Sequence, residues 1–329
     1  RLKNIWRPEN FQQHHMLQRG RARFEGWYFK LVDEPGEQPR AIIPGVFLGD
    51  DAHAFIQVLD GRAGTSVYHR FALDAFSASR DSFDVCIGRS RFGRDGISLD
   101  IEPGETDGGQ GVKGSVGFSE WNGWPVTAAS PGVMGPYSFV PFMEGKHGIL
   151  SMDHGLSGAL SVDGQQTVYD GGRGYIEKDW GRGFPSGYVW AQSNHFDRPG
   201  VSISASVARI PWLTGSFRGY LVGLLLDGQL LRFTTYTGAT IDSIAVDDDR
   251  YHLSIADRAH RLEITATRAG GALLMAPYEK RMVERVAETM TSTIDVRLCS
   301  RAGNDVLFEG TGAHGCLEVQ GKLDGVLRD

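Results

Sequence analysis

One carboxylate near the start of this chain lies between large aromatic residues. Residues 24–30 read Phe-Glu-Gly-Trp-Tyr-Phe-Lys. Side chains alternate between the two faces of a β-strand, so Glu25 should share a face with Trp27 and Phe29 and point away from Tyr28. An acid on the face where a core should form is a candidate for proton transfer. The alternative is a structural glutamate that pairs with a buried Arg or Lys, and both interpretations remain open.

A second segment, residues 174–196, is dense in the same residue types. If it forms a strand, alternation places three side chains on one face: Tyr175, Glu177 and Asp179. After a Gly/Pro turn, a second strand would present alternating aromatic and amide side chains: Tyr188, Trp190, Gln192 and Asn194. Two carboxylates, two amides and several rings would then lie a short distance apart. The alternative is a salt-bridged strand pair that uses Lys178 and Arg182.

Common nucleotide, nucleophile and metal motifs do not account for these residues. Residues 109–114 match G-x-G-x-x-G, but a strand-like segment follows where the pyrophosphate needs a helix N-terminus. The sequence has neither a P-loop nor a G-x-S-x-G nucleophile elbow. His147 and His154 could approach each other in a sheet, yet no His-Glu-x-x-His or Cys-x-x-Cys spacing supports a metal site. We therefore expect no cofactor and no metal.

Composition narrows the class of protein further. The chain has 329 residues, 41% of them hydrophobic and 22% charged, which is enough apolar material for a sizeable core. A net charge of −6 gives no basic footprint for nucleic acid. The most apolar run, residues 220–226, is far shorter than the roughly 18 residues of a membrane span, which leaves only transient contact with a membrane surface open. Three widely spaced cysteines and the lack of an apolar signal core favour a cytoplasmic location.

Turn residues and short β-rich runs dominate the rest of the chain. Glycine contributes 44 residues, well above its average share of about 7%, and turn signals recur every 8–12 residues or so, as in sandwiches and barrels. The expected strands are residues 24–32, 45–47, 54–60, 68–73, 83–87, 156–162, 188–194, 201–210, 219–226, 230–237, 251–256, 261–267, 292–299 and 316–320. Residues 278–289 alone favour an exposed helix. The pattern predicts an all-β protein.

One stretch interrupts this rhythm. Residues 121–143 contain four prolines and a run of apolar and aromatic side chains, Phe139 and Phe142 among them, without regular alternation. Ordinary solvent loops are less apolar, so the segment is either a loop that covers the core or a lid over an apolar cavity. Strand patterns resume after it. We therefore expect an N-terminal β domain at 1–165, which includes this lid, and a C-terminal β domain at 166–329.

The two acidic motifs resemble the tocopherol cyclase family. Its members carry F-E-G-W-Y-F-K near the start and, in mid-chain, Y-x-E-K-x-W-G-x-G-F-P followed by W-x-Q-x-N. The matching residues of this chain are 24–30, Tyr175, Glu177, Lys178, Trp180, Gly181, Gly183, Phe184, Pro185, Trp190, Gln192 and Asn194. Similarity extends through the C-terminal part to Gly321, so the resemblance covers nearly the whole chain. Two departures are Asp179, where plant members have Asn, and residues 136–154, which look unlike the plant enzymes.

This resemblance implies both a fold and a reaction. The family is distantly similar to the two-domain lipocalin-like group of carotenoid hydratases and fungal Diels–Alder cyclases, which implies two lipocalin- or calycin-like β-barrel or sandwich domains. The implied reaction is that of an intramolecular lyase, or isomerase, which closes a chromanol ring on a prenylated quinol. An acid protonates the alkene of the prenyl tail, and the phenol oxygen captures the tertiary cation. No redox cofactor is needed.

The acid must be a carboxyl group whose pKa burial raises well above its usual value of about 4.3. Glu177 is the preferred donor and Glu25 the second choice, while Asp179 is the least favoured because the family has Asn there. An apolar cavity of roughly 300–1,000 Å³ would hold the tail. The expected substrate contacts, with the two amides orienting the phenol, are Trp27, Phe29, Tyr175, Tyr188, Trp190, Gln192, Asn194, Phe139 and Phe142.

Other functions remain open at this point. The same scaffold could serve a hydratase, in which water captures the cation, or a pericyclase that needs only shape and polarisation. A non-catalytic carrier of lipophilic molecules is the common use of lipocalin-like barrels. The sequence leaves open the prenyl length, the ring methylation and the oligomeric state.

Overall fold

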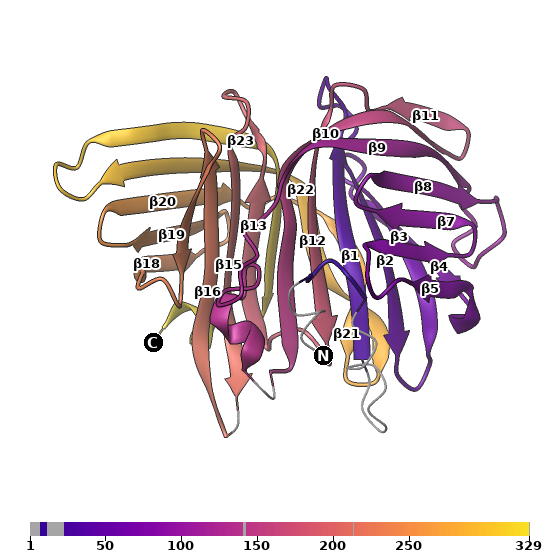
Figure 1. Ribbon diagram of the computed structural model, residues 1–329, viewed down its shortest axis with the longest axis horizontal. Helices are drawn as coiled ribbons and strands as arrows, with labels where there is room; N and C mark the ends of the chain where they lie inside the picture. The colour runs from indigo at the N-terminus through magenta and orange to yellow at the C-terminus, as the bar shows by residue number, and fades with distance from the viewer. Residues whose placement is uncertain (1–6, 12–22, 141–142, 213, 329) are drawn as a thin grey trace. The chain divides into compact units, whose positions relative to one another are not determined.

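The computed structural model describes residues 7–11, 23–140, 143–212 and 214–328, and nearly all of its regular structure is β-strand (Figure 1). The chain divides into two compact units. The first comprises residues 1–184 and 273–285, and the second comprises residues 185–272 and 286–329. The all-β fold class predicted from the sequence is confirmed.

The sheet of the first unit contains twelve strands within the described residues. They pair in the order β4-β3-β2-β1-β12-β10-β9-β8-β7-β6-β5, with β11 added to β10. Their bounds are β1 Arg23–Val32, β2 Arg40–Leu48, β3 His53–Asp60, β4 Thr65–Phe71, β5 Phe76–Ala78, β6 Asp84–Ile87, β7 Ser90–Gly93, β8 Gly96–Ile101, β9 Val112–Asn122, β10 Gly145–Val162, β11 Gln165–Val168 and β12 Arg173–Gly181. One face of β1 enters the apolar core, through Trp27, Phe29 and Leu31.

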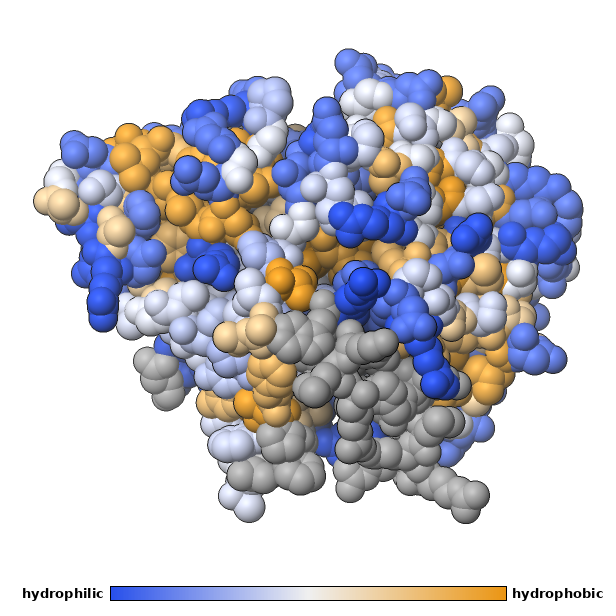
Figure 2. Space-filling view, in the orientation of Figure 1, coloured by the Kyte–Doolittle hydropathy of each residue, from blue (hydrophilic) through white to orange (hydrophobic). Residues whose placement is uncertain are grey.

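A second antiparallel sheet is built from β13 to β23. It pairs in the order β17-β16-β15-β13-β23-β22-β20-β19-β18, with β14 on β23 and β21 on β22. The bounds are β13 Gly187–Ser193, β14 His195–Phe196, β15 Ser202–Trp212, β16 Gly215–Leu226, β17 Gln229–Thr234, β18 Thr240–Val246, β19 Arg250–Ala256, β20 His260–Thr267, β21 Ala272–Tyr278, β22 Arg281–Ser300 and β23 Val306–Gly321. Val189 and Ala191 of β13 face its apolar core. Figure 2 shows apolar side chains, in orange, around β20.

The expected helix at residues 278–289 is wrong, because this segment is part of the β21–β22 hairpin. Its charged residues are spaced as in an exposed helix, but pairing of β22 with β21, and with β23 from Glu288 onward, overrides that local preference. The described helices are all short: η1 Leu73–Ala75, η2 Gly135–Phe139 and α3 Asp324–Leu327. Within the described residues, no helix is long and apolar enough to cross a membrane.

The passage between the units differs from the expected boundary near residue 165. β12 lies between β1 and β10 in the first sheet, so the chain leaves the first unit only after Phe184. Gly171 and Gly172 belong to the turn that leads from β11 into β12.

Residues 123–140 follow an irregular path after β9 ends at Asn122. A single β-bridge joins Val126 to Pro131, and η2 follows. Trp124 and Val133 are buried, which agrees with a segment that covers other residues rather than an ordinary solvent loop. Residues 141 and 142 lie outside the described part of the chain.

Candidate active site

Strands β10 and β12 place a histidine against two carboxylates. The two strands are antiparallel, and their register sets His147 opposite Asp179 and Ile149 opposite Glu177. Residues two apart on a strand share a face, so the side chains of His147, Glu177 and Asp179 lie on the same side of the sheet. Glu177 and Asp179 therefore share one face of β12, as the alternation of side chains along a strand predicts.

A glycine at the end of β12 permits this register. Gly181 has a φ of 148°, a region that residues with a side chain rarely adopt. A Cβ atom at this position would collide with the backbone carbonyl oxygen of Glu144. Because residue 181 is glycine, β10 can begin at Gly145 directly opposite it, two residues before His147.

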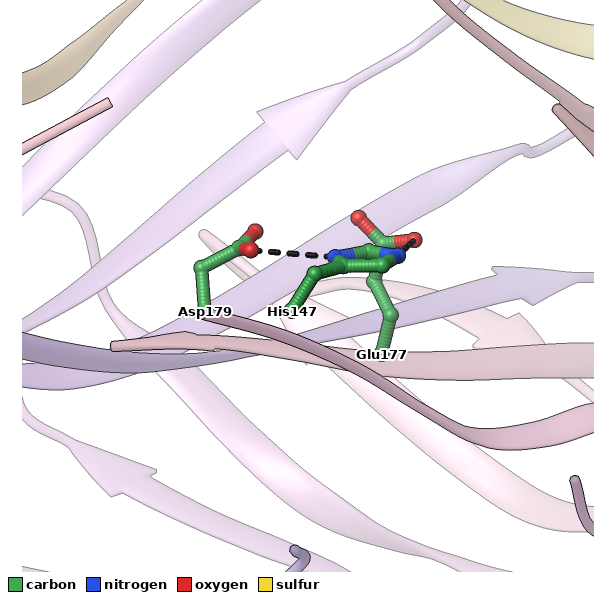
Figure 3. Close-up of side chains that lie close together, drawn as sticks. All are labelled: His147, Glu177 and Asp179. Carbon is green, nitrogen blue, oxygen red and sulfur yellow. Dashed lines mark hydrogen bonds and ion pairs between the residues drawn. The ribbon is translucent and has the colours of Figure 1, made fainter. Parts of the chain in front are cut away.

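The imidazole of His147 lies between the two carboxylates (Figure 3). Its Nδ1 atom is 3.0 Å from Oδ1 of Asp179, and its Nε2 atom is 3.7 Å from Oε2 of Glu177. The hydroxyl of Tyr175 donates a hydrogen bond of 2.6 Å to the same oxygen of Glu177. Only 15% of the His147 side chain and 8% of the Glu177 side chain are exposed. We call His147, Glu177, Asp179 and Tyr175 the acid cluster.

Electrostatics keep a proton on His147 at neutral pH. Burial, the largest single influence, lowers the pKa of the imidazole, but the negative charges of Asp179 and Glu177 and the hydrogen bond to Asp179 together outweigh it and raise that pKa to about 9. Nδ1–H can then donate to Asp179 while Nε2–H faces Glu177. A proton held between two bases in a largely buried place is suited to general acid–base chemistry.

Glu25, the second choice as proton donor, has a different environment. It lies on the other face of the β1–β12 pair, in register with Trp180. Its carboxylate forms an ion pair of 2.5 Å with Lys178, and neither side chain is exposed. Burial lowers the pKa of Lys178, an effect that the charge of Glu25 opposes. This arrangement is the structural pairing that the sequence left open for Glu25.

The cations considered for the second motif do not pair with the acid cluster. Lys178 points away from Glu177, as alternation predicts, and its ammonium lies 4.7 Å from the ring centre of Trp27. Arg182 lies 3.8 Å from the carboxylate of Glu144. The imidazole of His147 does lie within ion-pair distance of both Glu177 and Asp179.

The residues expected to bind substrate lie in several places. Trp27 and Phe29 are fully buried and stack on Phe83, so core packing fills the space around them. Phe139 is 43% exposed, and Phe142 lies outside the described residues. Four others belong to the second unit: Tyr188, Trp190, Gln192 and Asn194. Tyr175 alone of the expected contacts is part of the acid cluster.

A small hollow adjoins the acid cluster. Its lining residues are Pro8, Pro131, Gly132, Ser138, Lys146, His147 and Trp180. The ammonium of Lys146 donates a hydrogen bond of 2.8 Å to the carbonyl oxygen of Ser138. The volume is about 10 Å³, room for at most one water, whereas a cavity for a prenyl tail needs several hundred. The apolar cavity expected beneath residues 121–143 is therefore not open at this place.

The same three groups offer donors that a divalent cation accepts. The ligand atoms of His147, Glu177 and Asp179 all lie within 4.8 Å of one another. Each ring nitrogen of His147 already faces a carboxylate, however, and a cation would have to displace the imidazole proton. A shared proton accounts for this geometry without a metal.

His147 is the member of the acid cluster that sequence reasoning does not identify. The sequence suggests only that it could approach His154. That residue instead lies opposite Gly174, and its Nδ1 atom is 3.0 Å from Oγ of Ser151. Burial, together with the charge of Arg173, lowers the pKa of His154 to about 3. The two histidines therefore lie in separate environments, and of the two only His147 is protonated at neutral pH.

Comparison with known proteins identifies the family. A family model described as tocopherol cyclase-like matches residues 115–321, which is more than half of the chain and includes the whole acid cluster. The chain belongs to the tocopherol cyclase-like family. The first motif, residues 24–30, lies outside the matched region.

Two plant relatives of this tocopherol cyclase-like protein are similar over part of their length. A maize (Zea mays) protein named "Tocopherol cyclase, chloroplastic" is 29% identical over 194 residues, which are 55% of this chain and 40% of that protein. A rice (Oryza sativa subsp. japonica) protein named "Probable tocopherol cyclase, chloroplastic" is 28% identical over 211 residues, 60% of this chain and 44% of that protein. The chain thus matches less than half the length of these curated relatives.

One solved structure has a similar fold. The crystal structure of CghA with Sch210972 covers 92% of this chain and 89% of its own chain, with a TM-score of 0.55 and 12% sequence identity. At this identity the likeness shows the shared lipocalin-like β architecture and leaves the reaction to be argued from the site.

Proposed function

We propose that this tocopherol cyclase-like protein closes a chromanol ring on a prenylated hydroquinone. The observation that carries the proposal is the acid cluster, a buried site that keeps a proton at neutral pH within the region matched by the family model. A proton adds to the trisubstituted alkene of the tail, and the phenol oxygen attacks the resulting tertiary cation. The phenol proton then returns to the protein, so the reaction is an isomerisation without a redox change.

Each member of the acid cluster has a distinct task in this proposal. Glu177 delivers the proton to the alkene, and His147, whose Nε2 faces Glu177 at 3.7 Å, replaces it. Asp179 holds the imidazolium through Nδ1, and the hydroxyl of Tyr175 fixes the orientation of the Glu177 carboxylate. The acidic side chains of Glu177 and Asp179 favour a carbocation formed beside them.

The test is turnover of a prenyl-hydroquinone by the purified protein in D₂O. A chromanol that carries deuterium at the protonated carbon is the expected product. We expect Glu177→Gln to reduce turnover by about 10²-fold or more, because it removes the acid but keeps the size of the side chain. Substrate affinity should stay within about tenfold, since tail burial contributes equally to ground state and transition state. Glu37→Gln, in an exposed turn, is the matched control and should leave turnover unchanged.

The same incubation separates the alternative functions. A tertiary alcohol would indicate a hydratase, and binding without turnover would indicate a carrier. Turnover that survives in Glu177→Gln, His147→Gln and Asp179→Asn would contradict the acid cluster as the proton source and favour a pericyclase. A cytoplasmic location is part of the proposal, and the three free cysteines are compatible with it.

A further inference from the structure

In the second unit, β23 extends beyond its neighbour on one side. Pairing with β13 and β14 ends where Phe196 lies opposite Gly312, whereas pairing with β22 continues to Val306. Figure 1 shows the yellow β22–β23 hairpin reaching away from β13. Among the described residues, no strand pairs with 306–311 on the β14 side. Their outward backbone N–H and C=O groups therefore form an open sheet edge.

A hollow follows this edge. Its volume is about 410 Å³, within the range of ligand-binding sites, and it is lined by Phe196, Asp197, Arg198 and every residue from Val306 to Thr311. These residues mark the path that β14 would take if it continued past Phe196. The hollow thus corresponds to the place of one missing strand, along an edge of six residues.

The edge presents a different chemistry on each of its two faces. Phe308 points inward, where it belongs to the apolar core and contacts the ring of Phe196 edge-on, with centroids 5.9 Å apart, and its neighbour Glu309 is exposed. The register of β23 on β22 shifts between Phe308 and Val306, and both residues at that irregularity are exposed, Val306 by 46% and Leu307 by 49%. The edge residues 306–311 contain one charged side chain, Glu309, and no Lys or Pro.

Charge around the hollow is predominantly negative. Asp197 and Glu309 are both exposed. Arg198 is the cation among the lining residues, and it forms an ion pair of 2.5 Å with Asp227. A strand that occupied the hollow would therefore meet apolar side chains on the inner face and a carboxylate, Glu309, on the outer face.

We propose that this edge binds an extended peptide segment of a partner protein by strand addition. The peptide would carry apolar residues at every second position and Lys or Arg between them, because side chains alternate along a strand. Its main chain would pair with the open backbone groups of 306–311. A second copy of this chain would bring the same acidic edge and is disfavoured by repulsion. A purely apolar small molecule would leave the backbone groups of the edge without partners.

The test uses the whole protein and an acetylated, amidated peptide of alternating Lys and Val, eight residues long. We expect saturable binding by calorimetry, together with slower hydrogen exchange of the amides of residues 306–311. Val306→Lys should weaken binding at least tenfold, because it adds a cation to an edge that would pair with a basic peptide. Val168→Lys, on β11 and with a similar starting exposure of 54%, is the matched control and should bind within about twofold of the unchanged protein.

Three further measurements bear on the choice of occupant. A peptide of alternating Glu and Val should bind at least tenfold more weakly. Alternate amides of an extended peptide point to opposite sides, so N-methylation of the set that faces the edge should abolish binding and N-methylation of the other set should not. Binding that is unchanged in Val306→Lys, or that protects amides elsewhere, would overturn the proposal. Two results without peptide binding would also overturn the proposal. One is a dimer of this chain that Val306→Lys dissociates, and the other is a prenyl alcohol that binds in the hollow. None of these outcomes depends on cyclase activity.

Discussion

Asp179→Asn should release the proton that the acid cluster holds at neutral pH. Two unit charges 3.0 Å apart, as in the His147–Asp179 pair, interact by about 5 kcal/mol at an effective dielectric constant near 20. The rise in the His147 pKa from 6.5 to about 9 corresponds to only about 3 kcal/mol at 1.36 kcal/mol per unit, because burial opposes it. Removing the charge of Asp179 should therefore cancel the whole rise and bring the pKa below about 7.

The assay is a pH titration of the histidine ring carbons by NMR. In the unchanged protein, the Cε1 resonance of His147 should move with a midpoint near pH 9, and in Asp179→Asn it should move at least two units lower. His154 provides an internal reference, since its pKa of about 3 keeps its resonance constant above pH 5. The amide of Asn can still accept the Nδ1–H bond, so the variant tests the charge rather than the contact.

This titration can refute the reasoning directly. A wild-type midpoint near 6.5 would mean that the carboxylates do not hold the proton, and an unchanged midpoint in Asp179→Asn would assign that role to Glu177 alone. Turnover gives the corresponding functional readout. If the His147 proton feeds the reaction, Asp179→Asn should lose activity with rising pH at least two units below the pH at which the unchanged protein loses it.

Two predictions concern stability. Because the folded-state pKa of His147 lies above its unfolded value, its contribution is fully present below about pH 6.5 and is lost as the pH rises through 9, so the free energy of unfolding in urea should fall by up to about 3 kcal/mol over that window. The fall should be absent in His147→Gln, and a fall of equal size in that variant would assign it to other groups. Glu25→Gln should lower the free energy of unfolding by about 3–5 kcal/mol by leaving Lys178 buried without its carboxylate, and Glu25→Gln/Lys178→Met should regain most of the loss. If Glu25→Gln folds with unchanged stability yet loses all turnover, Glu25 is catalytic after all.

Local patterns were sufficient for most of the strands. Period-two alternation and turn residues predict segments such as 24–32 and 251–256, which β1 and β19 match within a residue or two. The failure at 278–289 has a physical cause. The spacing of charged residues reports on one segment alone, whereas this segment is held by pairing of β22 with β21 and, from Glu288 onward, with β23. Alternation gives the faces of a strand but not its neighbours.

The acid cluster illustrates the same limit. Glu177, Asp179 and Tyr175 are on one strand, so their common face is readable from the sequence. His147 reaches them only through the register of β10 on β12, and that register shifts twice between Ile149 and His154. No local pattern encodes those irregularities. The surroundings expected for Glu177 were apolar, but the structure gives it a hydroxyl and an imidazolium as partners.

The two motifs that resemble the tocopherol cyclase family acquire a joint explanation from the pairing of β1 with β12. Trp27 lies opposite Lys178 and Tyr28 opposite Glu177, so the two motifs form one two-stranded ribbon with two faces. On the core face, Lys178 neutralises Glu25 under the rings of Trp27 and Trp180. Because Lys178 is engaged there, it does not pair with Glu177, whose carboxylate faces His147 on the other side of the sheet. Neighbouring residues of the two motifs thus serve different purposes on the two faces of the ribbon. Glu25 and Lys178 form a structural ion pair on one face, and Glu177 faces His147 on the other. Both glutamates lie among aromatic residues, but of the two only Glu177 is suited to proton transfer.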